Sequence, residues 1–104
     1  MPAQINAPPP PYYAVIFTSR RSEVDAGYSA AAKRMLELAA QQPGFLGFET
    51  ARQDLGISVS YWTSLEAIKA WKENPEHRAM QNKAKEWYCS FRVRVCRVQK
   101  DYGF

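Results

Sequence analysis

The first strand-forming segment, residues 12–18, is apolar at both odd and even positions. Alternate side chains of a strand point to opposite faces of its sheet, so this segment predicts a strand that is buried on both faces. One layer of helices covers only one face. In a chain of 104 residues, a second copy of the same sheet is the simplest cover for the other face. The segment therefore predicts a homodimer that forms through the sheet face.

The remaining segments alternate between helical and strand-like patterns. Apolar residues recur at helical spacing up to Pro43-Gly44, which ends the first helix, and the loop ending at Gly56 joins two strands into a hairpin. The expected strands cover residues 12–18, 45–52, 57–62 and 88–100. The expected helical segments are 22–42, a short helix opened by residues 63–66 that carries Leu65, Ile68 and Trp71, and 75–86. The order β-α-β-β-α-β predicts a ferredoxin-like α+β fold, with a four-stranded antiparallel sheet and helices on one face.

Two local signals mark the second helical region. Thr63 and Glu66 have the spacing of a capping box, which predicts Thr63 as the N-cap of a short helix. Asn74 followed by Pro75 predicts a second helix start and a bend between the two helices. This bend is expected to bring Trp71 close to His77.

The last strand changes its apolar parity along its length. Phe91, Val93 and Val95 occupy one parity, whereas Cys96 and Val98 occupy the other. The change predicts either a β-bulge near residues 95–97 or a change in which face of the strand is covered.

The chain is expected to contain one domain, residues 12–104, preceded by a tail at residues 1–11. The tail has no charged side chain and holds five of the seven prolines, so it is expected to lie outside the fold. No apolar run is long enough for a membrane span, and the N-terminus lacks a signal-peptide pattern. Cys89 and Cys96 are too far apart along one strand for a disulfide and are expected to be buried or half-buried free thiols. These features predict a cytoplasmic protein.

The formal net charge of +4 comes mainly from the last strand. Four cations in one alternating segment are too few for a nucleic-acid surface, so no nucleic-acid partner and no membrane partner are expected. Two of these cations, Arg92 and Arg94, are candidates for holding an anionic ligand. Pairing of the same arginines with Glu49 or Glu66 is the alternative.

The candidate site is built around the one histidine of the chain, His77. Its position at a helix start favours the neutral imidazole, which can accept a proton from a phenol or ligate a haem iron. Simple packing at the helix start is the alternative role. The aromatic residues expected around it, as pocket walls or as core anchors, are Tyr61, Trp62, Trp71 and Trp87. Too few Cys and His residues are present for a metal site of that type.

The segment from Tyr61-Trp62 through Trp71 and Asn-Pro-Glu-His77 to Trp87-Tyr88, with the following Arg-Val-Arg-Val strand, resembles the antibiotic biosynthesis monooxygenase (ABM) family. Pro43-Gly44-Phe-Leu-Gly matches the usual turn of that family into its second strand. The resemblance covers about residues 12–104 and implies a dimeric α+β barrel.

The resemblance also implies an activity. Some members are cofactor-independent oxygenases of polycyclic phenols that use the electrons of the substrate itself. Haem-degrading members use an Asn, a Trp and an iron-ligating His; Trp71 matches the Trp, but Gln81 occupies the position of the His, and residues 12–18 contain no Asn. The resemblance therefore favours no cofactor over haem.

The sequence thus predicts a cofactor-independent monooxygenase of a phenolic or quinol-type small molecule. In it, His77 deprotonates the substrate, the tryptophans stack on its rings, and Arg92 or Arg94 stabilises the anion formed. The first alternative is a non-catalytic binding or stress-response protein with the same barrel and pocket, and the second is a haem-handling protein.

Overall fold

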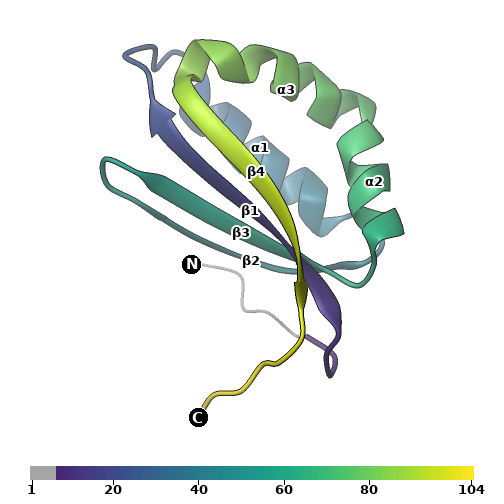
Figure 1. Cartoon of the computed structure of the whole chain (residues 1–104). Helices are drawn as coiled ribbons and strands as arrows, with labels where there is room; N and C mark the ends of the chain where they lie inside the picture. The colour runs from purple at the N-terminus through teal and green to yellow at the C-terminus, as the bar shows by residue number, and fades with distance from the viewer. Residues whose placement is uncertain (1–6) are drawn as a thin grey trace.

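The chain forms two layers, a four-stranded sheet and a layer of helices on one of its faces (Figure 1). In this computed structural model, which describes residues 7–104, the strand order is β2-β3-β1-β4 and every neighbouring pair is antiparallel. The elements are β1 (Tyr12–Arg21), α1 (Tyr28–Ala40), β2 (Phe45–Arg52), β3 (Gly56–Trp62), α2 (Leu65–Glu73), α3 (Pro75–Trp87) and β4 (Tyr88–Val98). The predicted ferredoxin-like arrangement, with helices on one face of an antiparallel sheet, is confirmed.

The strand register decides which side chains face the helices. Tyr13 of β1 pairs with Trp62 of β3, and Phe17 pairs with Val93 of β4. Trp62 stacks against Trp71 of α2. The side chains of all four strands that share a face with Trp62 therefore lie on the helix side of the sheet. The other parity forms the open face, which carries no helix. Its side chains include Ile16 and Thr18 of β1, Ile57, Val59 and Tyr61 of β3, and Arg92 and Arg94 of β4.

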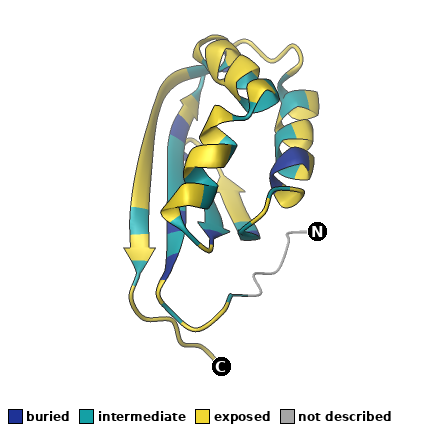
Figure 2. Ribbon diagram, turned by 90° about the vertical axis from the view of Figure 1, so that its right-hand side faces the viewer, coloured by how far each residue is buried: buried dark blue, intermediate teal, exposed yellow. Residues whose placement is uncertain are grey.

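The core is small, and its residues come from both faces of the sheet. Trp62 has no exposed surface, and the other buried apolar residues are Tyr12, Ala14, Leu38, Ala39 and Trp87. By contrast, β4 is exposed along most of its length, on both parities (Figure 2). The edge strand therefore has helix-side residues that the helices do not cover.

Helix α2 begins one residue later than the sequence predicts. The N-cap is Ser64, whose Oγ accepts a hydrogen bond from the Ala67 amide at 3.0 Å. Thr63 is instead an exposed residue whose amide donates to the Gly44 carbonyl at 2.8 Å. The predicted capping role of Thr63 is therefore wrong, because the turn at Gly44 holds the Thr63 backbone on the preceding strand. The predicted break at Asn74 is confirmed.

The last strand has no bulge at residues 95–97. Of the two predicted explanations for its change of apolar parity, a change in the face that is covered is the one that fits. Residues 91–98 pair with β1 without any register shift. The irregularity lies at the other end of the strand, where Arg20 pairs with Ser90 and Arg21 with Tyr88. Cys96 and Val98 lie on the open face because they follow the normal alternation of β4.

Helix α1 is shorter than the predicted segment 22–42. Gly27 has a φ of 80°, and Tyr28 is the first helical residue. The preceding loop is held in place by Ser22, which bonds the Glu86 and Trp87 carbonyls, and by Arg21.

The remaining expectations concern the termini and the cysteines. Residues 1–6 of the predicted tail lie outside the described residues. Cys89 and Cys96 are both free, but Cys89 is exposed, so the expectation of two covered thiols is wrong for this residue. Within residues 7–104, no helix is long and apolar enough to cross a membrane.

Candidate functional site

His77 is held at the start of α3 by its own backbone and by the helix before it. The Asn74 Oδ1 accepts hydrogen bonds from the amides of Glu76 and His77, at 3.0 and 3.2 Å. The imidazole stacks on the Trp71 ring with centroids 4.0 Å apart and planes inclined by 12°. Its Nδ1 lies 2.9 Å from the Trp71 carbonyl oxygen. The Asn74-Pro75 break therefore brings Trp71 and His77 together, as the sequence predicts.

These contacts determine the tautomer of His77. A carbonyl oxygen only accepts hydrogen bonds, so Nδ1 carries the proton and donates it to Trp71. Burial lowers the pKa of His77 below its ordinary value of 6.5, and the hydrogen bond to the Trp71 carbonyl opposes this effect. The ring is consequently neutral near pH 7, with a lone pair on Nε2 that can accept a proton.

An aromatic series connects His77 to the sheet. Trp71 is nearly parallel to Trp62, with ring centroids 6.2 Å apart, and Trp62 meets the edge of Phe45 at 5.4 Å. The Trp62 indole N–H donates to the Ser60 hydroxyl at 2.9 Å. Trp62 is fully buried, so it supports Trp71 from behind, and Trp71 itself is half-buried.

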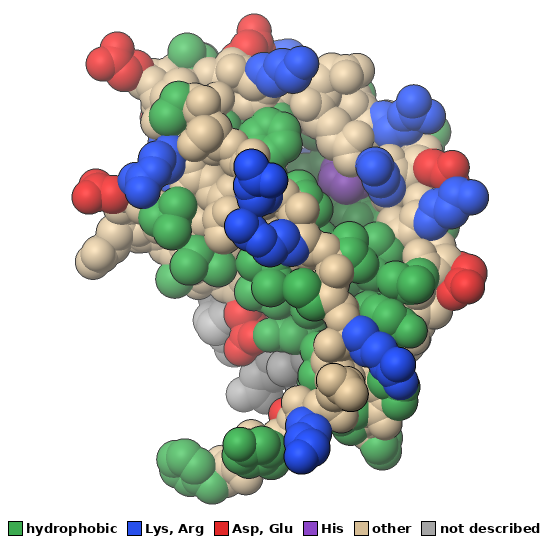
Figure 3. Space-filling view, viewed as in Figure 1, with side chains coloured by type: hydrophobic (Ala, Val, Ile, Leu, Met, Phe, Trp, Pro, Cys, Tyr) green, Lys and Arg blue, Asp and Glu red, His purple; other side chains and the backbone are tan. Residues whose placement is uncertain are grey.

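A hollow lies between this aromatic series and the edge strand. Phe91, Val93 and Val95 of β4 lie on the helix side of the sheet, yet 44%, 51% and 51% of their surfaces remain exposed. In the space-filling view, the molecule is hollowed between the helices and this strand, and the one histidine, in purple, lies inside the hollow (Figure 3). The structure therefore combines an uncovered apolar floor with a neutral imidazole.

Trp87 lies at the other end of the helix layer. Its indole N–H donates to the Ala26 carbonyl at 2.9 Å, and its ring meets the edge of Tyr28 at 6.1 Å. Because only 6% of Trp87 is exposed, it anchors the loop before α1. The structure does not bring it into contact with His77.

Tyr61, Arg92 and Arg94 lie on the open face of the sheet, away from His77. The Tyr61 hydroxyl donates to Glu49 at 2.7 Å, and burial together with this bond raises the pKa of Tyr61 to about 12. Among the described residues, neither arginine forms an ion pair with Glu49 or Glu66. The site expected from the sequence is thus divided between two faces.

Arg52 is the residue near the hollow that sequence reasoning missed. It ends β2, and its guanidinium lies 5.8 Å from the centre of the Tyr88 ring, which packs on Phe17 and Phe91 of the helix side. The sequence contains one indication of this position. Arg52 pairs with Gly56 across the hairpin, and a glycine leaves room for a long side chain to cross the strand.

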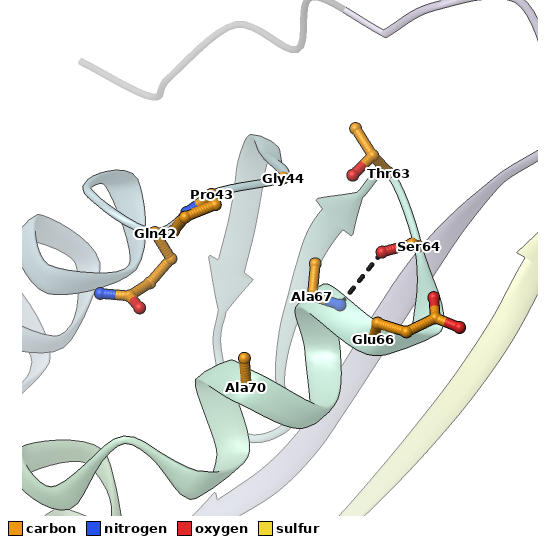
Figure 4. Close-up of a pocket in the computed structure, with 8 residues that line it drawn as sticks. All are labelled: Gln42, Pro43, Gly44, Thr63, Ser64, Glu66, Ala67 and Ala70. Carbon is orange, nitrogen blue, oxygen red and sulfur yellow. Dashed lines mark hydrogen bonds between the residues drawn. The ribbon is translucent and has the colours of Figure 1, made fainter.

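The other features of the described chain that could hold a ligand lie apart from His77. Residues 7–104 contain no group of three or more His, Cys, Asp or Glu side chains that could hold a metal. A surface hollow of about 330 Å³ lies between the Pro43-Gly44 turn and the start of α2 (Figure 4). Another, of about 300 Å³, lies beside Arg92 and Arg94. Neither is lined by His77.

Comparison with known proteins places this architecture in a family. The sequence model of the antibiotic biosynthesis monooxygenase family matches residues 11–83. The chain is 52% identical over 102 residues to the uncharacterized protein YqjZ of Bacillus subtilis (strain 168), covering 95% of this chain and 90% of that protein.

Solved structures share the fold at low sequence identity. SnoaB, a cofactor-independent oxygenase from Streptomyces nogalater, superposes with a TM-score of 0.77 at 12% identity, over 88% of this chain and 97% of SnoaB. A putative antibiotic biosynthesis monooxygenase from Nitrosomonas europaea superposes with a TM-score of 0.71 at 12% identity, over 94% and 97% of the two chains. By the match to residues 11–83, this chain belongs to the antibiotic biosynthesis monooxygenase family.

Proposed function

We propose that this protein is a cytoplasmic, cofactor-independent monooxygenase that oxidises a phenolic or quinol-type fused-ring compound in the hollow between the helices and β4. The observation that carries the proposal is the fixed tautomer of His77. Its Nδ1 is occupied by the Trp71 carbonyl at 2.9 Å, which leaves Nε2 as the acceptor for a substrate proton. The free thiols of Cys89 and Cys96 suit a reducing compartment.

The surroundings of His77 suit an aromatic substrate. The exposed side chains of Phe91, Val93 and Val95 offer an apolar floor beside the stacked pair of Trp71 and His77. Fused rings lose little conformational entropy on binding, and their burial on such a floor is favourable by about 25 cal/mol per Å². Trp62 and Trp87 are both buried, so neither of them belongs to this surface.

The chemistry requires one base and a substrate that is easily oxidised. For an anthrone, His77 removes a proton from the ring carbon, and the resulting carbanion gives electrons to dioxygen. One oxygen atom becomes the new ring carbonyl and the other leaves as water, so the substrate supplies all four electrons. The lowered pKa of His77 keeps the base in its neutral form at pH 7.

Two copies are proposed to join through the open faces of their sheets. Ile57 on this face is 43% exposed, and Ile16 and Val59 beside it are half-buried in the single chain. An apolar sheet face of this kind normally meets another apolar surface. The hollow that contains His77 lies on the opposite side of the sheet, so dimer formation leaves it open.

The proposal is tested by oxygen uptake with a panel of anthrones and hydroquinones, corrected for spontaneous oxidation in buffer. We expect uptake with the wild-type protein and loss of at least 99% of it in His77→Gln, because general-base catalysis contributes roughly 10²–10⁴-fold. Glutamine retains an amide that can donate to Trp71 but has no basic nitrogen. Val24→Ala, at an exposed loop residue, is the matched control and should retain full uptake.

The same experiment separates the alternatives. A non-catalytic binding or stress-response protein would bind these compounds without any uptake above buffer. A haem-handling protein would shift the Soret band of added hemin in a manner that depends on His77. We expect no such shift, because the resemblance places the iron-ligating position at Gln81.

A further inference from the structure

The guanidinium of Arg52 is held in a fixed place on the helix side of the sheet. Its Nη1 donates to the Ser19 carbonyl at 3.3 Å, and its Nη2 donates to the Ser19 hydroxyl. Ser19 is only 1% exposed, so this anchor belongs to the rigid sheet. A side chain at Gly56 would overlap the guanidinium, which shows that the glycine makes room for it across β3.

The charge of Arg52 has no acidic partner among residues 7–104. Two other arginines are neutralised: Arg21, at the end of β1, lies 3.0 Å from Asp25, and Arg34 of α1 forms two bonds to Glu76, at 2.5 and 2.9 Å. No carboxylate of the described residues lies within 4.0 Å of Arg52. Its two bonds to Ser19 leave three of its five N–H donors unused.

On the helix side of the sheet, the Arg52 guanidinium lies beside Ser19 and Gly56, at the end of the central strands opposite Trp62. Trp62, which supports the His77 end, is separated along β3 from Gly56 by six residues, or about 20 Å of strand. Between these ends, the aromatic rings of Phe17, Tyr88 and Phe91 continue the apolar floor of the hollow towards Arg52. A ligand that reaches both ends must therefore be elongated, and the unpaired charge of Arg52 favours a negative group at that end.

We propose that Arg52 is a specificity-determining residue that binds the carboxylate of an elongated, fused-ring aromatic acid. This inference rests on the proposed function, because it assigns the substrate class of the same hollow. The planar guanidinium suits a carboxylate, with which it forms charge-assisted hydrogen bonds. The role that the sequence suggests for Arg92 or Arg94 passes to Arg52, since those two arginines lie on the open face.

The experiment compares two probes that differ in charge and hardly in shape, anthracene-2-carboxylate and anthracene-2-carboxamide. Binding is followed by quenching of the tryptophan fluorescence at low salt. We expect the wild-type protein to bind the carboxylate about tenfold more tightly, as a charge-assisted hydrogen bond at a solvent-accessible site would provide. Arg52→Gln should reduce this preference to within about twofold, and Arg52→Lys should retain part of it.

Arg92→Gln is the matched control, because it removes the same charge from the open face and should leave the preference unchanged. Equal affinities of the wild-type protein for the two probes would overturn the proposal. Persistence of the preference in Arg52→Gln, its loss in Arg92→Gln, or no binding of the carboxylate would do the same. A carboxylate preference that depends on Arg52, found together with oxygen uptake that does not depend on His77, would support the binding role and contradict the proposed function.

Discussion

The protonation state of His77 is determined by two neighbours of different kinds. The Trp71 carbonyl fixes the proton on Nδ1, and burial disfavours the charged ring. The sequence predicts the neutral form from the helix start, whereas the main physical cause in the structure is burial. Proximity of Trp71 and His77 was predictable from Asn74-Pro75, because these residues impose a local bend. The tautomer was not, since it depends on a carbonyl that only the folded chain brings within reach.

The pH dependence of His77 follows from its lowered pKa. The imidazole should titrate below 6.5 in the folded protein and near 6.5 in urea, as ring nitrogen chemical shifts in NMR would show. Because the unfolded chain then binds the proton more readily, the free energy of unfolding should fall as the pH decreases from 6.5 towards the folded pKa.

His77→Gln is the control for this titration, since it removes the group and should make the decrease over the same pH interval smaller. Oxygen uptake should stay constant from pH 7.5 down to about 6.5 and decline only below it. A folded-state pKa above 6.5, or a proton on Nε2 in the neutral ring, would contradict the assignment.

Trp62 is the residue on which the site and the core depend together. It is fully buried and stacks with Trp71, so Trp62→Ala should decrease the free energy of unfolding by about 3–5 kcal/mol. Urea denaturation followed by circular dichroism measures this change. Tyr102→Ala, at a residue that is 92% exposed, should change stability by less than about 0.5 kcal/mol. A loss below about 1 kcal/mol in Trp62→Ala would mean that Trp62 is not a core anchor.

The helices and strands are the level at which the sequence is most informative. Apolar patterns identify the four strands and the first helix, because these patterns reflect which faces an element buries, and the helix-start signals at residues 63–66 and 74–75 identify the other two helices. The ends of the elements are less predictable. The N-cap of α2 is Ser64 and not the predicted Thr63, because the carbonyl of Gly44 binds the Thr63 amide. That contact joins residues that are far apart in sequence.

The corrected N-cap gives a direct test at the element scale. Ser64→Ala removes the acceptor of the Ala67 amide and should lower the free energy of unfolding by about 1 kcal/mol. Thr63→Ala is the matched variant, and it should change stability by less than about 0.5 kcal/mol because its hydroxyl caps no helix. Urea denaturation of both variants decides the assignment, and a larger loss in Thr63→Ala would reverse it.

At the scale of the whole molecule, the two faces of the sheet carry different side chains. The helix side holds His77 and Arg52, whereas the open face carries exposed apolar residues such as Ile57. The sequence predicts both faces as apolar, yet it assigns Arg92 and Arg94 to the same site as His77. Arg92 and Arg94 lie on the face of β4 opposite to the helices. Only the register of β4 with β1 shows which of its residues face the helices.

The open face predicts a dimer in solution. Sedimentation at micromolar concentration should give twice the mass of one chain. Ile57→Asp should shift the protein to monomer, because it places a charge in the contact between the two sheets. Val24→Asp, which changes an equally exposed apolar residue in the loop before α1, should leave the dimer intact. A wild-type protein that sediments as a monomer at these concentrations would refute the contact.

Oxygenation in the hollow without a cofactor, with His77 as the base, is the activity that we propose for this protein. The decisive measurement is mass spectrometry of the product formed from an anthrone under isotopically labelled dioxygen, after exhaustive dialysis of the protein against a chelator. We expect one labelled oxygen atom per quinone, formed well above the buffer rate by the wild-type protein and at the buffer rate by His77→Gln. An unlabelled product, or an equal rate in His77→Gln, would contradict it.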